Sequence, residues 1–126
     1  MTKYIIISLG AILGANLRYI VQAWFGDRGW TSFPYSTLLI NVTGAFVLAF
    51  FLTLITERIV IDPNWRLLIA VGFCGSYTTF STLTYETLTV SQAAGWGTAL
   101  LNIGGSGVLG MLATVLGVLA ARRFGG

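Results

Sequence analysis

The chain has 126 residues, of which 56% are hydrophobic and only 9% are charged, with a formal net charge of +3 and no histidine. A typical soluble domain has about 25% charged residues, so this composition excludes an ordinary soluble domain and indicates a membrane protein. A chain of this length accommodates four spans of about 20 residues with short connections, and little else. The basic residues are few and scattered, which argues against a nucleic-acid-binding protein.

Four long apolar segments follow one another along the chain. They predict an all-α membrane protein in which residues 1–126 form a single domain of four transmembrane helices. The predicted spans cover residues 4–25, 36–56, 65–90 and 96–121. The first span contains the pattern Gly10-x-x-x-Gly14, which favours close packing against another helix. The first connection, residues 26–34, is rich in turn residues and aromatic residues, as expected at a membrane surface.

The third span has an unusual composition near its middle. Two glycines, a serine and two threonines fall between Gly72 and Thr79, and hydroxyl residues continue at Ser81, Thr82 and Thr84. Polar groups without partners are costly in hydrocarbon, and irregular backbone is tolerated at membrane depth only where it lines a cavity or is buried in protein. The sequence therefore predicts a helix broken near residues 75–79, and this segment is the predicted site of a transport function.

The basic residues are unevenly divided between the two ends of the predicted bundle. Four spans place both termini on one side of the membrane, and Arg28 is the only basic residue in the connections on the other side. The positive-inside rule therefore predicts cytoplasmic termini. The basic residues on the side of the termini are Lys3, Arg58, Arg66, Arg122 and Arg123.

Several polar side chains within the spans require an explanation, because such residues tend to face a bundle interior or an aqueous path. Arg18 either extends its guanidinium to the near interface or serves at a pore vestibule. Asn41 donates either to an anion or to a carbonyl of a neighbouring helix. Asn102 and Ser106 share one face of the fourth span, among glycines that allow another backbone to approach closely. Each residue alone is typical of interhelical contact, whereas together with the third span they indicate a lined pathway.

The missing residue types indicate which ion such a pathway would carry. Glu86 is the only carboxylate well inside a predicted span, and it lies toward the end of that span, whereas proton-coupled cation exporters usually need a carboxylate near the midplane. The chain offers hydroxyl and amide donors together with Phe80, whose ring edge carries partial positive charge. This set favours an anion. No nucleophile–base pair, metal cluster or phosphate-binding loop is evident, so an enzyme is not expected.

The third span resembles the signature of a known family. The segment Gly72-Phe-Cys-Gly-Ser-Tyr-Thr-Thr-Phe-Ser-Thr-Leu-Thr-Tyr-Glu86 is similar to the motif G-x-x-G-G-x-T-T-F-S-T-F-S-x-E of the CrcB/Fluc fluoride channels. The resemblance implies a fluoride-selective ion channel in the inner (plasma) membrane that exports fluoride passively and gives fluoride resistance. Further matches, in the same order and spacing, are Gly14-Ala-Asn-Leu-Arg18, Thr37-Leu-Leu-Ile-Asn-Val-x-Gly44 and Thr114-Val-Leu-Gly117.

The resemblance also implies an assembly and a set of site residues. The family forms an antiparallel, dual-topology dimer in the lipid bilayer, with two fluoride pores and a structural sodium ion at the dimer centre. By motif position, the carbonyls of Gly75 and Thr78 would hold the sodium, while Arg18 and Glu86 would have vestibule or structural roles. The residues implied for the pore are Asn41, Thr79, Phe80, Ser81, Thr82, Leu83 and Ser106.

Two features of the sequence support alternatives. Leu83 stands where the motif has a second phenylalanine, and the charge bias favours one orientation in the membrane. Both are expected of a non-conducting or partner-dependent subunit of a heterodimeric channel, although the homodimer remains the main prediction. A small multidrug exporter is a further alternative, but it would require a midplane glutamate in the first span, where this chain has Arg18.

Overall fold

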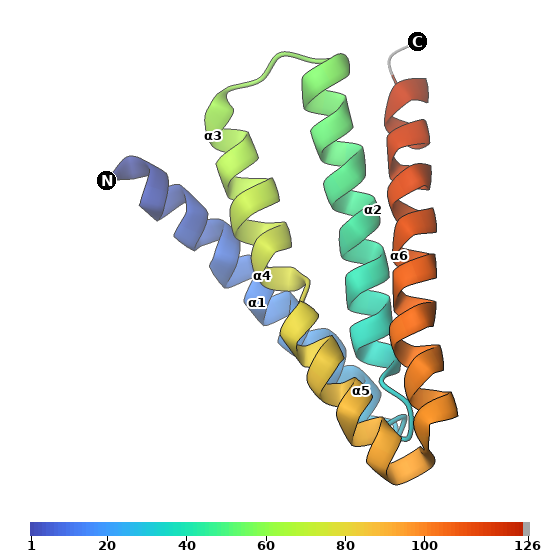
Figure 1. Ribbon diagram of the computed structural model, residues 1–126. Coiled ribbons are helices and arrows are strands. Elements are labelled where there is room, and N and C mark those ends of the chain that lie inside the picture. Colours follow the sequence, from blue (N-terminus) through green and yellow to red (C-terminus); the bar gives the residue numbers. More distant parts are fainter. Residues whose placement is uncertain (125–126) are drawn as a thin grey trace.

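The computed structural model describes residues 1–124, and every regular element in that range is helical (Figure 1). An eight-residue stretch of π-helix, η1, lies between two short α-helices. The elements are α1 (Thr2–Asp27), α2 (Tyr35–Glu57), α3 (Pro63–Arg66), η1 (Leu67–Cys74), α4 (Gly75–Tyr77), α5 (Phe80–Ala94) and α6 (Trp96–Arg123).

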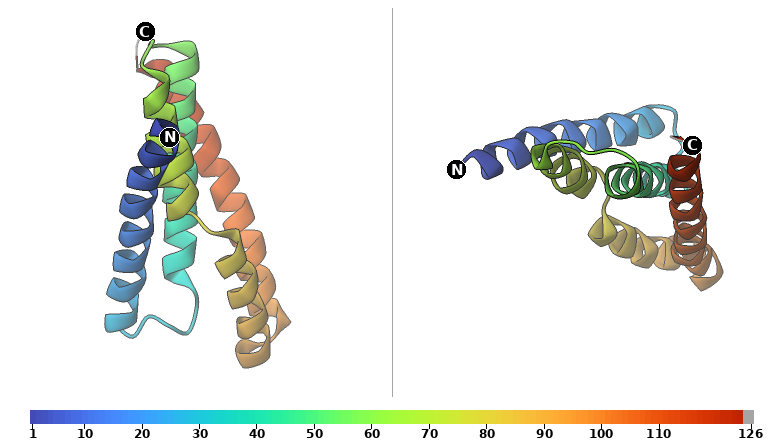
Figure 2. Two further views of the ribbon diagram at one scale, coloured as in Figure 1. Left: turned by 90° about the vertical axis from the view of Figure 1, so that its left-hand side faces the viewer. Right: turned by 90° about the horizontal axis from the view of Figure 1, so that it is seen from above.

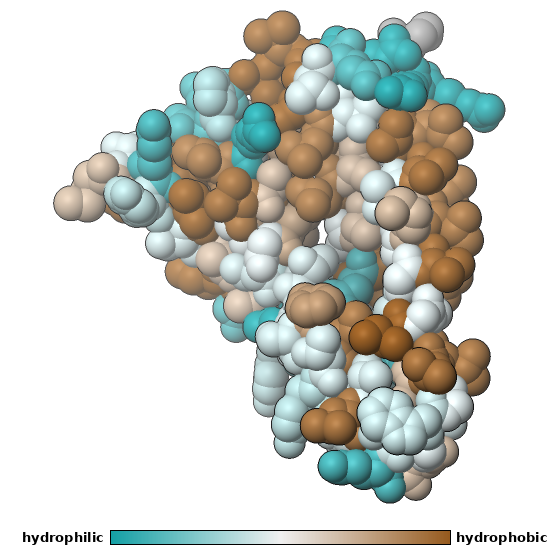
Figure 3. Space-filling view, viewed as in Figure 1, coloured by the Kyte–Doolittle hydropathy of each residue, from teal (hydrophilic) through white to brown (hydrophobic). Residues whose placement is uncertain are grey.

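Four of the helical stretches are long and apolar enough to cross a membrane. They are α1, α2, the stretch Pro63–Ala94 that includes α3 to α5, and α6. Their outward faces carry many large apolar side chains, such as Leu101 and Met111, which are 70% and 65% exposed. In the space-filling view, hydrophobic residues cover much of α6, and hydrophilic residues gather at the end where the C-terminus lies (Figure 3). The predicted all-helical fold with four candidate spans is confirmed.

The two parts of the third stretch pack against different neighbours. Seen from above, α1 lies along η1 and α4, whereas α5 lies along α6 on another side of the molecule (Figure 2). The remaining large contact is between α2 and α6, which run side by side for most of their length (Figure 1). The passage from α4 to α5 therefore takes the chain from the α1 side of the fold to the α6 side.

Glycines bring two pairs of helix backbones into close contact, α1 with η1 and α2 with α6. A Cβ added at Gly10 or Gly14 would lie 2.1 or 2.2 Å from a carbonyl oxygen of η1, so the predicted close-packing face of the first span is confirmed. A Cβ at Gly117 of α6 would lie 2.6 Å from the carbonyl oxygen of Phe46 in α2. The glycines around Asn102 have no close neighbour within the described chain. An added Cβ would meet nothing within 4 Å at Gly104, Gly105, Gly107 and Gly110.

The ends of α2 and α6 near the C-terminus are joined by charged groups. Arg122 Nε donates to Glu57 Oε2 at 3.0 Å, and a second guanidinium nitrogen donates to Oε1 at the same distance. Arg58 also donates to the backbone carbonyl of Arg122, close to the end of α6. These exposed contacts join the ends of the two helices, beyond the glycine contact at Gly117.

Candidate functional site

The segment between α4 and α5 has extended backbone. The helix α4 ends at Tyr77, Thr78 has φ −80° and ψ 155°, Thr79 has φ −150° and ψ 122°, and α5 begins at Phe80. The ribbon leaves helical geometry at this point and resumes in α5 (Figure 1). Thr79 serves as the N-cap of α5, because its Oγ1 accepts a hydrogen bond from the Thr82 N–H at 3.2 Å.

The side chain of Asn41 holds this extended segment against α2. Its Nδ2 donates to the Thr79 carbonyl at 3.0 Å, and its Oδ1 accepts from the Thr79 N–H at 2.9 Å. A single amide thereby satisfies both backbone polar groups of a residue that is only 9% exposed. One of the two roles considered for Asn41, a bond to a neighbouring backbone, is thus present in the structure, and the side chain also reaches the pocket described next.

A pocket of about 430 Å³ lies beside this segment, between α2, α5 and α6. Five of the seven pore residues implied by the resemblance line it. Ser81 and Thr82 do not: Ser81 is exposed, and Thr82 is half-buried and accepts a hydrogen bond from Thr79 Oγ1 at 3.0 Å. The lining residues are Asn41, Thr78, Thr79, Phe80, Leu83, Ile103, Ser106 and Gly107.

The lining of this pocket combines hydroxyl, amide and aromatic groups, and within residues 1–124 it includes no charged side chain. Ser106 is 6% exposed, and its buried hydroxyl has no hydrogen-bond partner within the described chain, so its O–H is available as a donor. Phe80 is 75% exposed, whereas Leu83 is buried. A small anion that leaves water needs close donors of this kind, and a ring edge adds a weaker positive contact.

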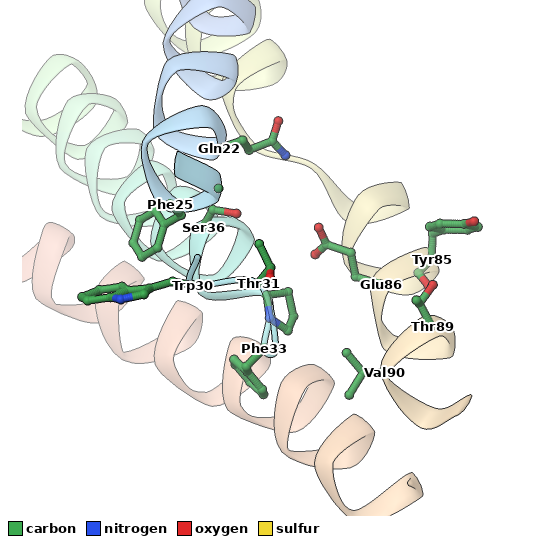
Figure 4. Close-up of a pocket in the computed structure, with 12 residues that line it drawn as sticks. Gln22, Phe25, Trp30, Thr31, Phe33, Ser36, Tyr85, Glu86, Thr89 and Val90 are labelled. Carbon is green, nitrogen blue, oxygen red and sulfur yellow. The ribbon is translucent and has the colours of Figure 1, made fainter. Parts of the chain in front are cut away.

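Glu86 lies in a separate pocket of about 280 Å³, at the end of the molecule that carries the loop between α1 and α2. Figure 4 shows the side chain directed from α5 into the space that faces Gln22 and Phe33. One carboxylate oxygen, Oε2, is buried and has no hydrogen-bond partner in the described residues. Arg18 is half-buried on α1 and lines neither this pocket nor the pocket around Asn41. Neither of the residues implied for a vestibule therefore lines the pocket around Asn41.

Two buried contacts involve residues that sequence reasoning did not single out. Thr87 accepts from Asn102 Nδ2 at 3.0 Å and donates to the carbonyl of Leu83 at 2.7 Å. The Tyr77 hydroxyl lies 2.9 Å from Thr43 Oγ1. The spacing of Leu83 and Thr87, four residues apart on one helix face, is the signal that would have pointed to Thr87.

The carbonyls of Gly75 and Thr78 are arranged differently from those of a continuous helix. In an α-helix they would accept from the N–H groups of Thr79 and Thr82, four residues further on. These two N–H groups donate instead to the side chains of Asn41 and Thr79. The two carbonyls are therefore released from their helical partners, and backbone carbonyl oxygen is a ligand type that suits a hard cation such as sodium.

These observations define the chain as a small multi-helix membrane protein with a polar pocket at an irregular segment. The sequence profile of the family described as "CrcB-like protein, Camphor Resistance (CrcB)" matches residues 5–118, so the chain belongs to this family and is a multi-pass membrane protein. The resemblance found in the third span is confirmed.

Several relatives match the chain over nearly its whole length. A protein of Koribacter versatilis (strain Ellin345) is 49% identical over 96% of this chain and 95% of its own length. A protein of Sulfurihydrogenibium sp. (strain YO3AOP1) is 45% identical over 97% and 98%. A protein of Chloroflexus aurantiacus is 39% identical over 126 residues, which is 100% of both chains. All three are named "Fluoride-specific ion channel FluC".

Proposed function

We propose that this chain forms a fluoride-selective ion channel, which exports fluoride passively across the membrane and gives fluoride resistance. Family membership and the names of the relatives support this function, and they indicate an ion channel rather than an enzyme. The observation that carries the proposal for this chain is the pocket at the start of α5. It gathers Asn41, Phe80 and Ser106 from three different helices around one space of about 430 Å³.

The pocket would replace the water that surrounds a fluoride ion. Ser106 offers a buried hydroxyl with no other partner in the described chain, and Phe80 offers a ring edge at an exposed position. Ser81 and Thr82 follow Phe80 at the start of α5, and their hydroxyl groups would extend the row of donors. Fluoride is small, so donors that approach closely compensate its dehydration better than that of a larger anion such as chloride.

The subunit's surface supports an antiparallel dimer in the lipid bilayer. Phe80 is 75% exposed and Ser81 is exposed, although both belong to a predicted pore at membrane depth. A Cβ added at Gly104, Gly105, Gly107 or Gly110 of α6 would meet no other atom of the described chain within 4 Å. A second copy in the opposite orientation would cover both surfaces and complete two pores. We place this dual-topology dimer in the inner (plasma) membrane, where one subunit has its termini on the cytoplasmic side, the orientation that the basic residues favour, and the other subunit has the opposite orientation.

We further propose that the third span works as a broken transmembrane helix with a structural sodium ion at the dimer centre. The released carbonyls of Gly75 and Thr78 fit this role, since the N–H groups that would occupy them donate elsewhere. Bound sodium would neutralise carbonyl dipoles that converge from two subunits. Fluoride flux after exhaustive exchange of sodium for N-methyl-D-glucamine tests this: lost flux that sodium restores is expected, and undiminished flux would contradict it.

Growth on fluoride tests the channel function in cells. A fluoride-sensitive bacterial strain without its own fluoride exporter should regain growth when it expresses this chain, and it should gain no resistance to quaternary ammonium compounds. Asn64→Ala, an exposed substitution in α3, is the control for expression. Resistance to quaternary ammonium compounds without fluoride resistance would favour a multidrug exporter instead.

A subunit that depends on a different partner is the second candidate function. Two observations favour it: Leu83 in place of an aromatic residue, and the bias of basic residues toward the end with the termini. An antiparallel homodimer requires the chain to insert both ways, which a strong charge bias opposes. A topology reporter fused to the C-terminus separates the two candidates. Equal inside and outside populations support the homodimer, and a single orientation supports the heterodimer.

A further inference from the structure

A hydrogen-bonded pair between α5 and α6 lies one helical turn from the pocket in which the proposed fluoride pathway runs. Leu83 and Thr87 are four residues apart on α5, and Ser106 and Asn102 are four residues apart on α6, so each pair shares a helix face. Leu83 and Ser106 line the pocket. The other two residues, Thr87 and Asn102, meet through a hydrogen bond of 3.0 Å.

We propose that Asn102 is a positioning residue that sets the separation of Leu83 and Ser106 across the pocket. The inference rests on the proposed fluoride pathway. Asn102 Nδ2 donates to Thr87 Oγ1, and the Thr87 hydroxyl donates to the Leu83 carbonyl at 2.7 Å. A continuous chain of hydrogen bonds thus runs from the side chain of α6 to the backbone of the residue that forms the opposite wall of the pocket.

The surroundings of the Asn102–Thr87 hydrogen bond explain why it would set the position of Leu83 in the pocket wall. Apart from the bonds at the turn around Gly95, where Thr98 Oγ1 donates to the Ala94 carbonyl at 3.4 Å, it is the only hydrogen bond between α5 and α6 within residues 1–124. Near the C-terminus of α6, Gly117 lets the backbone of α2 approach closely. A Cβ added at any glycine of α6 between residues 104 and 110 would meet no other atom of the described chain within 4 Å. The position of α5 relative to α6 therefore depends on side chains. Asn102 and Thr87 are 1% and 8% exposed, so water does not compete for their bond.

The orientation of the Asn102 amide distinguishes positioning from direct contact with fluoride. The single hydroxyl hydrogen of Thr87 points to the Leu83 carbonyl, so Thr87 Oγ1 can only accept from Asn102. This fixes Nδ2 toward Thr87 and leaves Oδ1 as the free end of the amide, buried and without a partner in the described chain. A carbonyl oxygen repels an anion, so Asn102 acts through Thr87 rather than as a fluoride ligand.

The Asn102–Thr87 hydrogen bond and the hydrogen bonds of Asn41 to Thr79 fix α5 at two points on either side of the pocket. Asn41 holds the N-terminal end of α5 to α2 through Thr79. Asn102 holds α5 to α6 one turn beyond Leu83. With both contacts present, α5 cannot rotate about its axis or tilt at Leu83 without breaking one of them. The separation of Leu83 and Ser106 across the pocket is then fixed.

Fluoride and chloride efflux from liposomes test the inference on the full-length purified protein. Thr87→Val keeps the shape of the side chain and removes both hydrogen bonds, whereas Thr87→Ser keeps the hydroxyl. An interhelical hydrogen bond of this kind corresponds to about threefold to twentyfold in an equilibrium between two arrangements. We therefore expect Thr87→Val and Asn102→Ala each to change fluoride flux by about that factor, with the double variant no worse than either one. Thr87→Ser should keep the flux of the unmodified chain.

The control is Thr56→Val, at an exposed residue whose hydroxyl bonds only within α2. Unchanged flux in Thr87→Val would overturn the inference, as would effects that multiply in the double variant. A loss in Asn102→Ala alone would also overturn it and indicate direct contact with fluoride. Size-exclusion chromatography of each variant, with dimeric protein required before flux is compared, separates altered positioning from misfolding. Absence of flux in the unmodified chain would instead contradict the proposed function.

Discussion

The contact between Asn41 and Thr79 permits the most direct calculation of a mutational effect. Asn41→Ala removes two hydrogen bonds of 3.0 and 2.9 Å and leaves the N–H and the carbonyl of Thr79 without their partner. Thr79 is 9% exposed, so water reaches it poorly. A buried polar group without a partner costs about 1–3 kcal/mol, which gives about 2–6 kcal/mol for the pair. This is a large part of the total of about 5–15 kcal/mol that stabilises a typical folded protein.

The assay is thermal unfolding of the detergent-purified protein, followed by size-exclusion chromatography, together with fluoride efflux from liposomes. A loss of 2 kcal/mol or more should lower the unfolding temperature by about 5 °C or more. Fluoride flux should fall as well, because the start of α5 carries the pocket residues Phe80 and Leu83. Asn64→Ala is the matched control, since that asparagine is exposed in α3. If Asn41→Ala unfolds at the same temperature as Asn64→Ala, the assigned role of the amide is wrong.

Three further substitutions test other parts of the structure. Gly117→Val should prevent stable folding, because its Cβ would lie 2.6 Å from a carbonyl oxygen of α2, whereas Gly97→Ala meets nothing within 4 Å and should fold normally; expression and gel filtration compare the two. Leu83→Phe should raise fluoride flux by adding a ring edge to the pocket, and flux equal to or below that of the unmodified chain would argue against aromatic stabilisation of the ion. Arg122→Gln should leave the unfolding temperature almost unchanged, because its ion pair with Glu57 is exposed to solvent; a large drop in the unfolding temperature would show that this pair holds α2 to α6.

The length and apolar composition of the segments were sufficient to predict the four candidate spans, because a bilayer imposes a minimum length on each crossing helix. The pattern at Gly10 and Gly14 likewise predicted a close-packing face, but not its partner. Which helix approaches is decided by the whole fold, and here it is η1. At the glycines of α6 near Asn102, no other part of the described chain approaches closely, since glycine permits close approach without requiring it.

The contacts that organise the pocket were harder to predict for a physical reason. Asn41 and Thr79 are 38 residues apart in the sequence, so local patterns contain no information about their pairing. Two roles for Asn41 remained open until the structure placed its amide on a backbone. Thr87 resembles any helical threonine that donates to the carbonyl four residues earlier. Only the packing of α5 on α6 shows that its oxygen also accepts from Asn102.

Fluoride efflux from liposomes that contain only this purified chain, with chloride as the control anion, tests the central claim most directly. The account predicts rapid fluoride efflux without chloride efflux, from a homodimer in which the pocket around Asn41, Phe80 and Ser106 forms part of each pore. Well-folded dimeric protein that releases no fluoride, or that releases chloride equally well, would contradict it.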